Sequence, residues 1–271
     1  MLKIENYEVL GWEHAIRGMR NPKNSWDRSD SFMCKEEAEG ECYPECVFRN
    51  ECPVYGTEDF FVVGPNDHKL MMTLASGGPV HAKYRRMITV YLDITAPLYW
   101  WKEFDTYKVG TVANSCSTMH KIHDKPFTIE DFSFDEDLLE DEIYYDPSDI
   151  YAYGDDGYVE HTHFEICADR VVSICESLRK MYNHYISRSK NPDITDAERK
   201  HFVRAAKRYW RMLVQLLPTS YNQKRTVMLN YEVLHNIYES RRHHKLDEWH
   251  TLCDWIEKLP YSELITGEKD A

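Results

Sequence analysis

The sequence is poor in basic residues for its size. Among 271 residues, 33 Lys and Arg stand against 46 Asp and Glu, which gives a formal net charge of -13. Proteins that bind DNA or RNA usually carry a basic face, so this balance argues against a nucleic-acid polymer as partner. It leaves room for a pocket that holds one nucleotide, because a few local lysine or arginine side chains suffice for one phosphate.

Long apolar runs are also missing. No stretch reaches about 18 apolar residues, so the sequence predicts no membrane-spanning helix and no membrane partner. The opening segment, MLKIENYEVLGWEHAI, lacks the apolar centre of a signal peptide. We therefore expect a cytoplasmic protein whose eight cysteines are thiols or metal ligands rather than disulfides.

Several catalytic motifs are absent as well. The sequence contains no glycine-rich phosphate loop, no G-x-S-x-G turn and no H-E-x-x-H helix, and it has no internal repeat. What it does contain is aromatic: 19 Tyr, 10 Phe and 7 Trp. A chain of this length can bury a stable core without disulfides or a structural metal. Its aromatic side chains offer stacking surfaces for planar ligands.

Local patterns predict a mixed fold. A strand with a turn is expected at 2–12, and a half-buried strand at 87–95, where apolar and polar residues alternate. Helices are expected at 13–20, at 66–76 with Asn66 as cap, after Pro97 over 98–107, at 168–186, from a capping box at Thr195 and Glu198 to Pro218, and at about 226–240. The class is α/β or α+β, a central sheet with packed helices. We expect one domain, 1–271, with a Cys-rich insertion at about 34–62 and an acidic insertion at about 124–165.

The segment from Ile94 to His120 resembles the flavin-dependent thymidylate synthases. That family has a strand, an Ala-Pro pair, a helix and then Arg-His-Arg, followed after seven residues by Ser. Here Ala96-Pro97 and the helix match. The Arg-His-Arg falls on Thr106, Tyr107 and Lys108, the Ser falls on Cys116, and a later family Arg falls on Thr118.

A second match lies in LLPTSYNQKRTVMLNYEVLHNIYESR. Leu217-Pro218, Asn230, Asn236 and Arg241 fall at family positions without a gap. Lys224 takes the place of a family Arg that binds the nucleotide phosphate, and Glu232 reverses the charge of another. The Ala-Gln-x-Glu pattern that follows the last Arg is replaced by residues around Leu246 and Asp247. A weaker third match is His81, which follows Gly78.

The resemblance covers about 60–120 and 205–250, and it implies a thymidylate-synthase-complementing-protein-like fold. It also implies one-carbon transfer from a reduced folate to C5 of a deoxyuridine-type nucleotide such as dUMP, with FAD, NADPH and a homotetramer. The implied roles are: Arg241 and Cys116 in catalysis; Lys224, Lys108, Thr118 and Asn114 in nucleotide binding; Asn230, Asn236, Tyr107 and His81 in cofactor binding.

The spacing of Asn230 and Arg241 has a reading of its own. Eleven residues bring both side chains to one stripe of a helix, roughly 16 Å apart, together with Leu234 and Ile237. The two polar groups could contact both ends of a nucleotide or flavin. The alternative is a helix with polar ends over an apolar centre. In the family, the Arg stabilises negative charge on the uracil ring.

Cys116 is a notable departure from the family Ser. A thiolate there could attack the pyrimidine ring, and Lys108 and His120 are near it in sequence and could lower its pKa. The alternative is a small thiol that replaces a small hydroxyl.

Four further cysteines, Cys34, Cys42, Cys46 and Cys52, lie within nineteen residues. This density in a cytosolic chain suggests a structural zinc or iron–sulfur site, with unligated thiols as the alternative. His161 and His163 alternate on a possible strand beside Glu160 and are more typical of a surface than of a metal site.

Two other functions stay open. The fold could have lost catalysis and serve as a nucleotide-binding or protein-interaction module, which the changes at 106–108 and at Glu232 favour. It could also modify a different pyrimidine nucleotide. Such divergent relatives of the family are expected in phage genomes, where altered pyrimidines are common.

Overall fold

The computed structural model describes residues 2–34, 60–134 and 163–267, and its contacts divide the chain into two compact units. The first unit comprises Met1–Lys3, Ile94–Thr106 and Asn114–Arg225. The second unit comprises Ile4–Asp93, Tyr107–Ala113 and Thr226–Ala271. Each unit is therefore assembled from segments that lie far apart in the sequence. The single domain with two insertions stays a prediction.

Four strands form the main sheet, in the order β1 (Lys3–Leu10), β4 (Thr89–Pro97), β6 (Asn222–Asn230) and β5 (Val112–Ser115). The two central strands, β4 and β6, each begin in one unit and end in the other. Along β4, the buried Val90 and Leu92 flank the exposed Tyr91, as period-two alternation requires. A central sheet with helices confirms the predicted mixed class.

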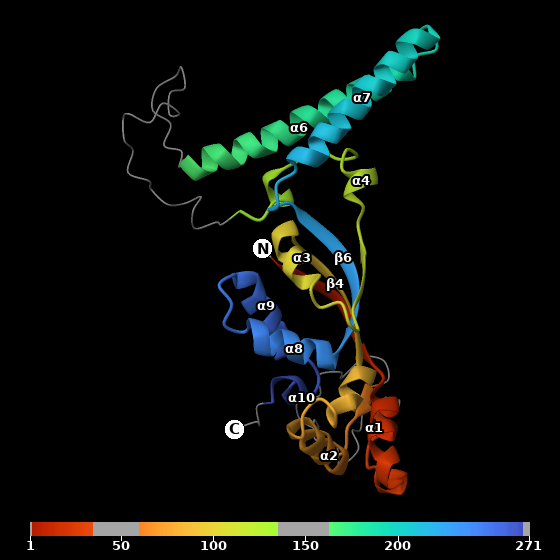
Figure 1. Ribbon diagram of the computed structural model, residues 1–271, viewed down its shortest axis with the longest axis vertical. Helices are drawn as coiled ribbons and strands as arrows, with labels where there is room; N and C mark the ends of the chain where they lie inside the picture. The colour runs from red at the N-terminus through yellow and green to blue at the C-terminus, as the bar shows by residue number, and fades with distance from the viewer. Residues whose placement is uncertain (1, 35–59, 135–162, 268–271) are drawn as a thin grey trace, which may run out of the picture. The chain divides into compact units, whose positions relative to one another are not determined.

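The first unit contains a long helical hairpin (Figure 1). Its helices α6 (His163–Ser189) and α7 (Asp196–Leu216) pack side by side. The predicted capping box is confirmed, because the Thr195 hydroxyl accepts from the Glu198 N–H and the Glu198 carboxylate accepts in return. Shorter elements complete this unit: α3 (Leu98–Phe104), α4 (Thr118–Lys121) and η4 (Ile129–Asp131).

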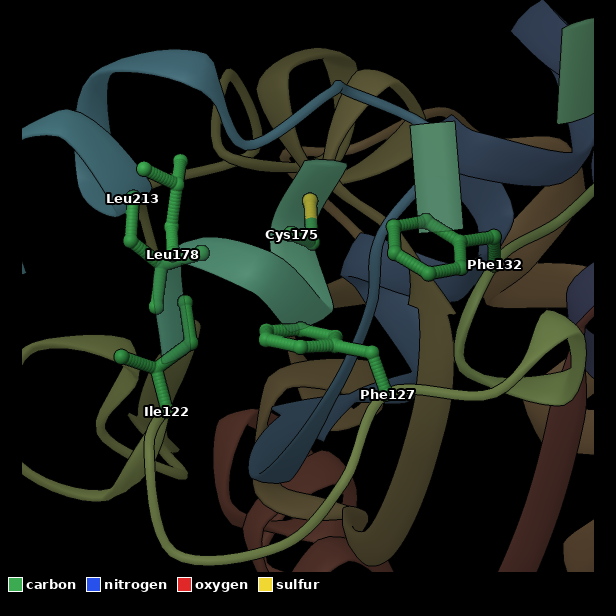
Figure 2. Packing of buried hydrophobic residues seen from close by; sticks show 6 residues of the cluster. All are labelled: Ile122, Phe127, Phe132, Cys175, Leu178 and Leu213. Atoms are coloured by element: carbon green, nitrogen blue, oxygen red, sulfur yellow. The ribbon is translucent and has the colours of Figure 1, made fainter. Parts of the chain in front are cut away.

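A hydrophobic cluster joins this hairpin to the segment after α4. Figure 2 shows its six labelled side chains, which are Ile122, Phe127, Phe132, Cys175, Leu178 and Leu213. The segment is also tied down by polar contacts, since Glu176 on α6 accepts from the Phe127 N–H at 3.1 Å and from the Arg179 guanidinium at 2.7 Å. The start of the predicted acidic insertion thus contributes Phe127 and Phe132 to a core.

The second unit consists mostly of short elements. They are α1 (Trp12–Arg20), η1 (Asn21–Lys23), η2 (Trp26–Arg28), the antiparallel pair β2 (Phe32–Cys34) and β3 (Phe60–Val62), α2 (Pro65–Ser76), η3 (Ala82–Met87), α8 (Tyr231–Arg241), α9 (Asp247–Ile256) and α10 (Glu263–Thr266). Trp12 packs edge-on against Tyr231, with ring centroids 5.3 Å apart. Helix α8 buries Leu234 and Ile237 completely, and α9 lies beside it (Figure 1).

The predicted helix at 226–240 is wrong in its first five residues. Those residues belong to β6, and α8 begins only at Tyr231. Val227 and Leu229 are buried while Thr226 is exposed, which is the alternation of a strand. Asn230 marks the change of element, since its side chain accepts from the Val233 N–H at 3.1 Å and caps the helix.

Three smaller predictions also need correction. Helix α2 begins at Pro65 with Gly64 as its N-cap, so Asn66 is not the cap. The carboxylate of Asp30 accepts from the backbone N–H groups of Asn66 and Asp67 at the start of this helix. Helix α3 ends at Phe104, short of residue 107. His163 begins α6 and so lies on a helix, not on a strand. No helix in the described ranges is both long and apolar enough to cross a membrane.

Candidate functional site

A pocket of about 350 Å³ opens in the first unit, which is within the size range of small-ligand sites. It lies between the end of β5, α4 and the start of β6. The pocket is lined by Cys116, Ser117, Thr118, Lys121, Ile122, Asp124, Lys125, Tyr221, Asn222, Gln223 and Lys224. Three residues assigned from the sequence, Cys116, Thr118 and Lys224, therefore lie around one cavity.

Two hydrogen bonds to its main chain hold Cys116 against β6. Its N–H donates to the carbonyl of Lys224 at 2.9 Å, and its own carbonyl accepts from Nε2 of Gln223 at 3.0 Å. Gln223 is buried, and its Oε1 accepts from Nε of Arg225 at 3.0 Å. The thiol of Cys116 is exposed. The strand thus fixes the backbone at this position and leaves the side chain accessible.

Arg225 is itself fixed from two sides. Its Nη1 donates to Asp105 at 2.8 Å, and its Cζ lies 4.1 Å from the centroid of the Trp101 ring, within cation–π range. Trp101 in turn donates from Nε1 to the carbonyl of Gln223 at 2.9 Å. A continuous chain of contacts therefore runs from α3 through β6 to the wall of the pocket.

Two lysines of the pocket are paired with carboxylates. Lys121 donates to Asp124 at 2.7 Å, which raises the pKa of Lys121 and lowers that of Asp124. Lys125 donates to Asp131 at 2.6 Å, and this contact raises the lysine pKa. Both amines stay protonated at neutral pH. With the ammonium group of Lys224 and the hydroxyls of Ser117 and Thr118, they form a donor set suited to a phosphate.

Tyr221 adds a neutral wall to this charged rim. Burial raises the pKa of its phenol, so the hydroxyl stays protonated near neutral pH. Ser117 has a local role too, since its hydroxyl accepts from the His120 N–H at 3.1 Å at the start of α4. His120 is exposed and is not among the residues that line the pocket.

Arg241 lies in the second unit, in what we call the Arg241 cradle, formed with Tyr107 and Trp249. Its Nε donates to the Tyr107 hydroxyl at 3.0 Å, and its Cζ lies 4.7 Å from the centroid of Trp249. The Tyr107 centroid is 5.8 Å from the same carbon. Trp249 on α9 is fully buried. The guanidinium is thus held by a charge-assisted hydrogen bond and an aromatic face.

The other predicted site residues are spread over both units. Asn114 is exposed on β5 in the first unit and does not line the pocket. Lys108, His81 and Asn236 are exposed in the second unit. Their implied roles stay predictions.

Solved structures match this architecture over almost the whole chain, although no protein-family profile and no curated protein matches the sequence. A thymidylate synthase X (ThyX) from Helicobacter pylori, crystallised with FAD and dUMP, aligns with a TM-score of 0.53 over 98% of both chains at 14% identity. A UMP/dUMP methylase, PolB from Streptomyces cacaoi, bound with 5-Br dUMP, aligns with a TM-score of 0.51 at 13% identity, over 98% of this chain and 95% of that one. This chain has the ThyX fold.

The residues that the resemblance aligns with the family's Arg-His-Arg make other contacts in this structure. The Thr106 hydroxyl donates to the carbonyl of Glu103 at 2.7 Å, and the Tyr107 hydroxyl accepts from Arg241. Lys108 alone retains a positive charge, at an exposed position. Gly110 follows with φ +83°, and a Cβ there would come within 2.8 Å of Nδ2 of Asn230. The segment 107–110 therefore packs along α8, from its first residues to its last.

Glu232, which the resemblance aligns with a family arginine, is buried near two arginines. Its carboxylate lies 3.9 Å from Nη1 of Arg85 and 3.8 Å from Nη2 of Arg86. Arg85 is also buried, whereas Arg86 is exposed. The reversed charge is thus compensated inside the second unit, and it does not by itself indicate a lost function.

Sequence reasoning missed several of these residues. Lys121, Lys125 and Tyr221 line the pocket, and the Lys-x-x-Asp spacing of Lys121 and Asp124 was the one local sign of a paired charge. No local sequence pattern indicated Trp249, because its contact with Arg241 depends on how α9 packs against α8.

The metal prediction is not tested. Among the residues that the structure describes, no group of three or more His, Cys, Asp or Glu side chains could hold a metal ion. Cys42, Cys46, Cys52 and His161 lie outside the described residues, as does the side chain of Cys34.

Proposed function

We propose that this chain binds a deoxyuridine-type nucleotide such as dUMP and transfers a one-carbon unit from a reduced folate to C5 of its base. The observation that carries the proposal is the pocket, where Cys116, Thr118 and Lys224 meet around one cavity. The resemblance implies nucleotide binding for Thr118 and Lys224 and a catalytic role for Cys116. Two proteins of the same fold have a related ligand, dUMP in ThyX and 5-Br dUMP in PolB.

The donor set of the pocket favours the phosphate end of the nucleotide. Lys224 supplies positive charge and Thr118 supplies a hydroxyl, whereas the charges of Lys121 and Lys125 are offset by Asp124 and Asp131. Lysine binds phosphate as a point charge without a fixed fork, so Lys224 is the main phosphate contact in this proposal. In this proposal the exposed thiol of Cys116 lies beside the pyrimidine ring and is its nucleophile. The catalytic role that the resemblance implies for Arg241, a residue of the second unit, stays a separate prediction.

Flavin is the cofactor that the fold implies, and the ThyX structure contains FAD. A flavin pyrophosphate carries two negative charges, for which the family supplies three basic groups. At the same positions this chain supplies one exposed lysine, since Thr106 and Tyr107 are engaged with Glu103 and Arg241. These residues do not fit a pyrophosphate site, and we derive no step through flavin. NADPH and a homotetramer remain expectations from the resemblance.

The same donor set favours a second candidate function, a nucleotide-binding or protein-interaction module without catalysis. In such a module the pocket would keep its lysines, because they serve binding, while the 106–108 segment would be free to change. A nucleotide-binding module and the enzyme agree on dUMP binding and differ in turnover, whereas a protein-interaction module requires neither.

Binding is tested by titrating dUMP into the wild-type chain, Lys224→Ala and Lys207→Ala in a calorimeter. Lys207 is exposed on α7, does not line the pocket, and serves as the matched control. We expect about tenfold weaker binding for Lys224→Ala, the loss of one charged contact, and no change for the control. Equal affinities for all three proteins would exclude the pocket as the nucleotide site.

Turnover is tested by release of tritium from dUMP labelled at C5, in the presence of methylenetetrahydrofolate, NADPH and FAD. The enzyme predicts release by the wild-type chain and its loss in Cys116→Ala. The module predicts binding without release. An absorbance spectrum of the purified protein, before and after incubation with FAD, shows separately whether flavin is retained.

A further inference from the structure

We propose that Gln223 and Arg225 are positioning residues for Cys116. The guanidinium of Arg225 sets the orientation of the Gln223 amide, and that amide fixes the main chain from which the thiol projects. The proposal rests on the proposed function for the reaction that the thiol performs. The residues involved lie on α3, on β6 and directly after β5, and all of them belong to the first unit.

Both peptide groups that flank the Cα atom of Cys116 are fixed. The N–H donates to the carbonyl of Lys224 at 2.9 Å, and the carbonyl accepts from Nε2 of Gln223 at 3.0 Å. Because a peptide group is planar, a hydrogen bond on each side restrains the two backbone angles between them. These angles set the direction of the Cα–Cβ bond. The direction in which the exposed thiol leaves the main chain is therefore fixed by two hydrogen bonds.

The second of these bonds depends on which way round the Gln223 amide lies. A primary amide donates from its nitrogen and accepts at its oxygen, whereas a guanidinium only donates. Nε of Arg225 donates to Oε1 at 3.0 Å, so the oxygen end faces Arg225 and the nitrogen end faces the Cys116 carbonyl. Without Arg225, the amide would be free to turn over and to place its oxygen against another oxygen. Gln223 is buried, so water has little access to replace a lost partner.

Arg225 is held in its turn by α3. Its Nη1 donates to Asp105 at 2.8 Å, and its Cζ lies 4.1 Å from the centroid of the Trp101 ring. Trp101 is buried, and its Nε1 donates to the main-chain carbonyl of Gln223 at 2.9 Å. Trp101, Arg225 and Gln223 therefore contact one another in a closed ring, which restrains all three side chains before any ligand is bound.

A fixed direction of the thiol matters for the rate of attack on a pyrimidine ring. A nucleophile that is displaced by about 1 Å from its approach to the reacting atom can react about 100-fold more slowly. The contacts that hold the nucleotide in the proposed function come from Lys224 and Thr118, and not from the Gln223 side chain. Loss of the Gln223 amide should therefore lower the rate and leave the affinity for dUMP nearly unchanged.

The restraint can be observed without activity, by the exchange rate of the Cys116 N–H in a protein labelled with 15N-cysteine. Cys116→Ser identifies the signal by its absence. Gln223→Met keeps the length and the neutral charge of the side chain but has no donor for the Cys116 carbonyl. We expect exchange at least about tenfold faster, because a segment restrained on one side opens more often. Gln215→Met is the matched control, since Gln215 is exposed on α7 and does not line the pocket.

Arg225→Met is the second variant, and it keeps an apolar chain over the Trp101 ring while it removes the donor that orients the amide. It should also speed the exchange of the Cys116 N–H, by about threefold or more. An unchanged rate in Gln223→Met would overturn the proposal. A change confined to Gln223→Met would overturn the part assigned to Arg225. If Gln223→Met does not fold, the rate in Arg225→Met decides alone.

The positioning role is then tested by tritium release from dUMP labelled at C5, with the dUMP affinity measured by calorimetry. Gln223→Met should lower kcat at least about tenfold and keep the Kd for dUMP within about threefold of wild type. Faster exchange with an unchanged kcat would overturn the positioning role, and so would a loss of affinity as large as the loss of rate. If the wild-type chain releases no tritium, the proposed function fails, and the exchange rates still decide whether Gln223 and Arg225 fix Cys116.

Discussion

The pocket of the first unit and the Arg241 cradle of the second hold their functional side chains by opposite means. In the pocket, hydrogen bonds to residues of β6 fix the backbone of Cys116. Lys121 and Lys125 pair with the carboxylates of Asp124 and Asp131. In the cradle, a guanidinium is fixed by a phenol and by a buried indole.

This difference predicts which residues tolerate substitution. A side chain whose backbone is fixed can be changed without displacing its neighbours. A side chain that is fixed by other side chains depends on each of them. Stability should therefore be sensitive to substitutions in the cradle and tolerant of substitutions in the pocket, although the resemblance implies site residues in both regions.

The largest expected effect comes from Trp249→Ala. Removing a fully buried indole leaves a cavity, which should lower the free energy of unfolding by about 3–5 kcal/mol. Lys224→Ala, which removes a partly buried pocket amine, should stay within about 0.5 kcal/mol of wild type. Urea denaturation of both variants measures the contrast. Similar losses in the two would contradict the comparison.

Next in size is the buried charge at the start of α8. Glu232→Arg should destabilise the chain by about 3 kcal/mol, because it places a third positive charge beside Arg85 and Arg86. The double variant with Arg85→Glu should recover most of the loss, since it restores one pair of opposite charges. Thermal denaturation of the two single variants and the double variant gives this coupling. Additive losses would show that the two side chains do not interact.

A smaller effect is expected at Gly110, which joins the cradle to the helix cap. Gly110→Ala should cost about 1–3 kcal/mol, since φ is +83° and the new Cβ would clash with Asn230. Gly78→Ala is the control, because Gly78 has φ +84° and nothing within 4 Å of an added Cβ. The difference between the two free energies of unfolding isolates the clash. No difference would mean that the 107–110 segment does not pack on α8.

The residues explain why the sequence predicted some of these features and not others. The Thr195 capping box and the alternation around Tyr91 are local signals, and the structure confirms both elements. The predicted helix is wrong at residues 226–230 because a short apolar stretch before a helix fits the periodicity of a strand as well as that of a helix. Cys116, Thr118 and Lys224 were found by their spacing relative to a family. The contact of Arg241 with Trp249 depends on tertiary packing, and no local pattern encodes it.

The smallest expected effect concerns Glu176, which ties the segment after the pocket to α6. The hydrogen bonds from Arg179 are the main cause that lowers the pKa of this carboxyl from 4.5 to about 2. A carboxyl with a depressed pKa stabilises the folded state fully above its unfolded value, and this contribution is lost as pH falls from about 4.5 toward 2.

Other carboxylates titrate in the same range, so the test compares the wild-type chain with Glu176→Gln. At pH 6 the variant should be less stable by about 1 kcal/mol, as is typical of a partly exposed ion pair, and the gap should close near pH 2. Glu239→Gln, at an exposed position on α8, should show no gap at either pH. A gap for Glu176→Gln that persists unchanged to pH 2 would mean that the hydrogen-bonding shape of this side chain, and not its charge, holds the Phe127 segment.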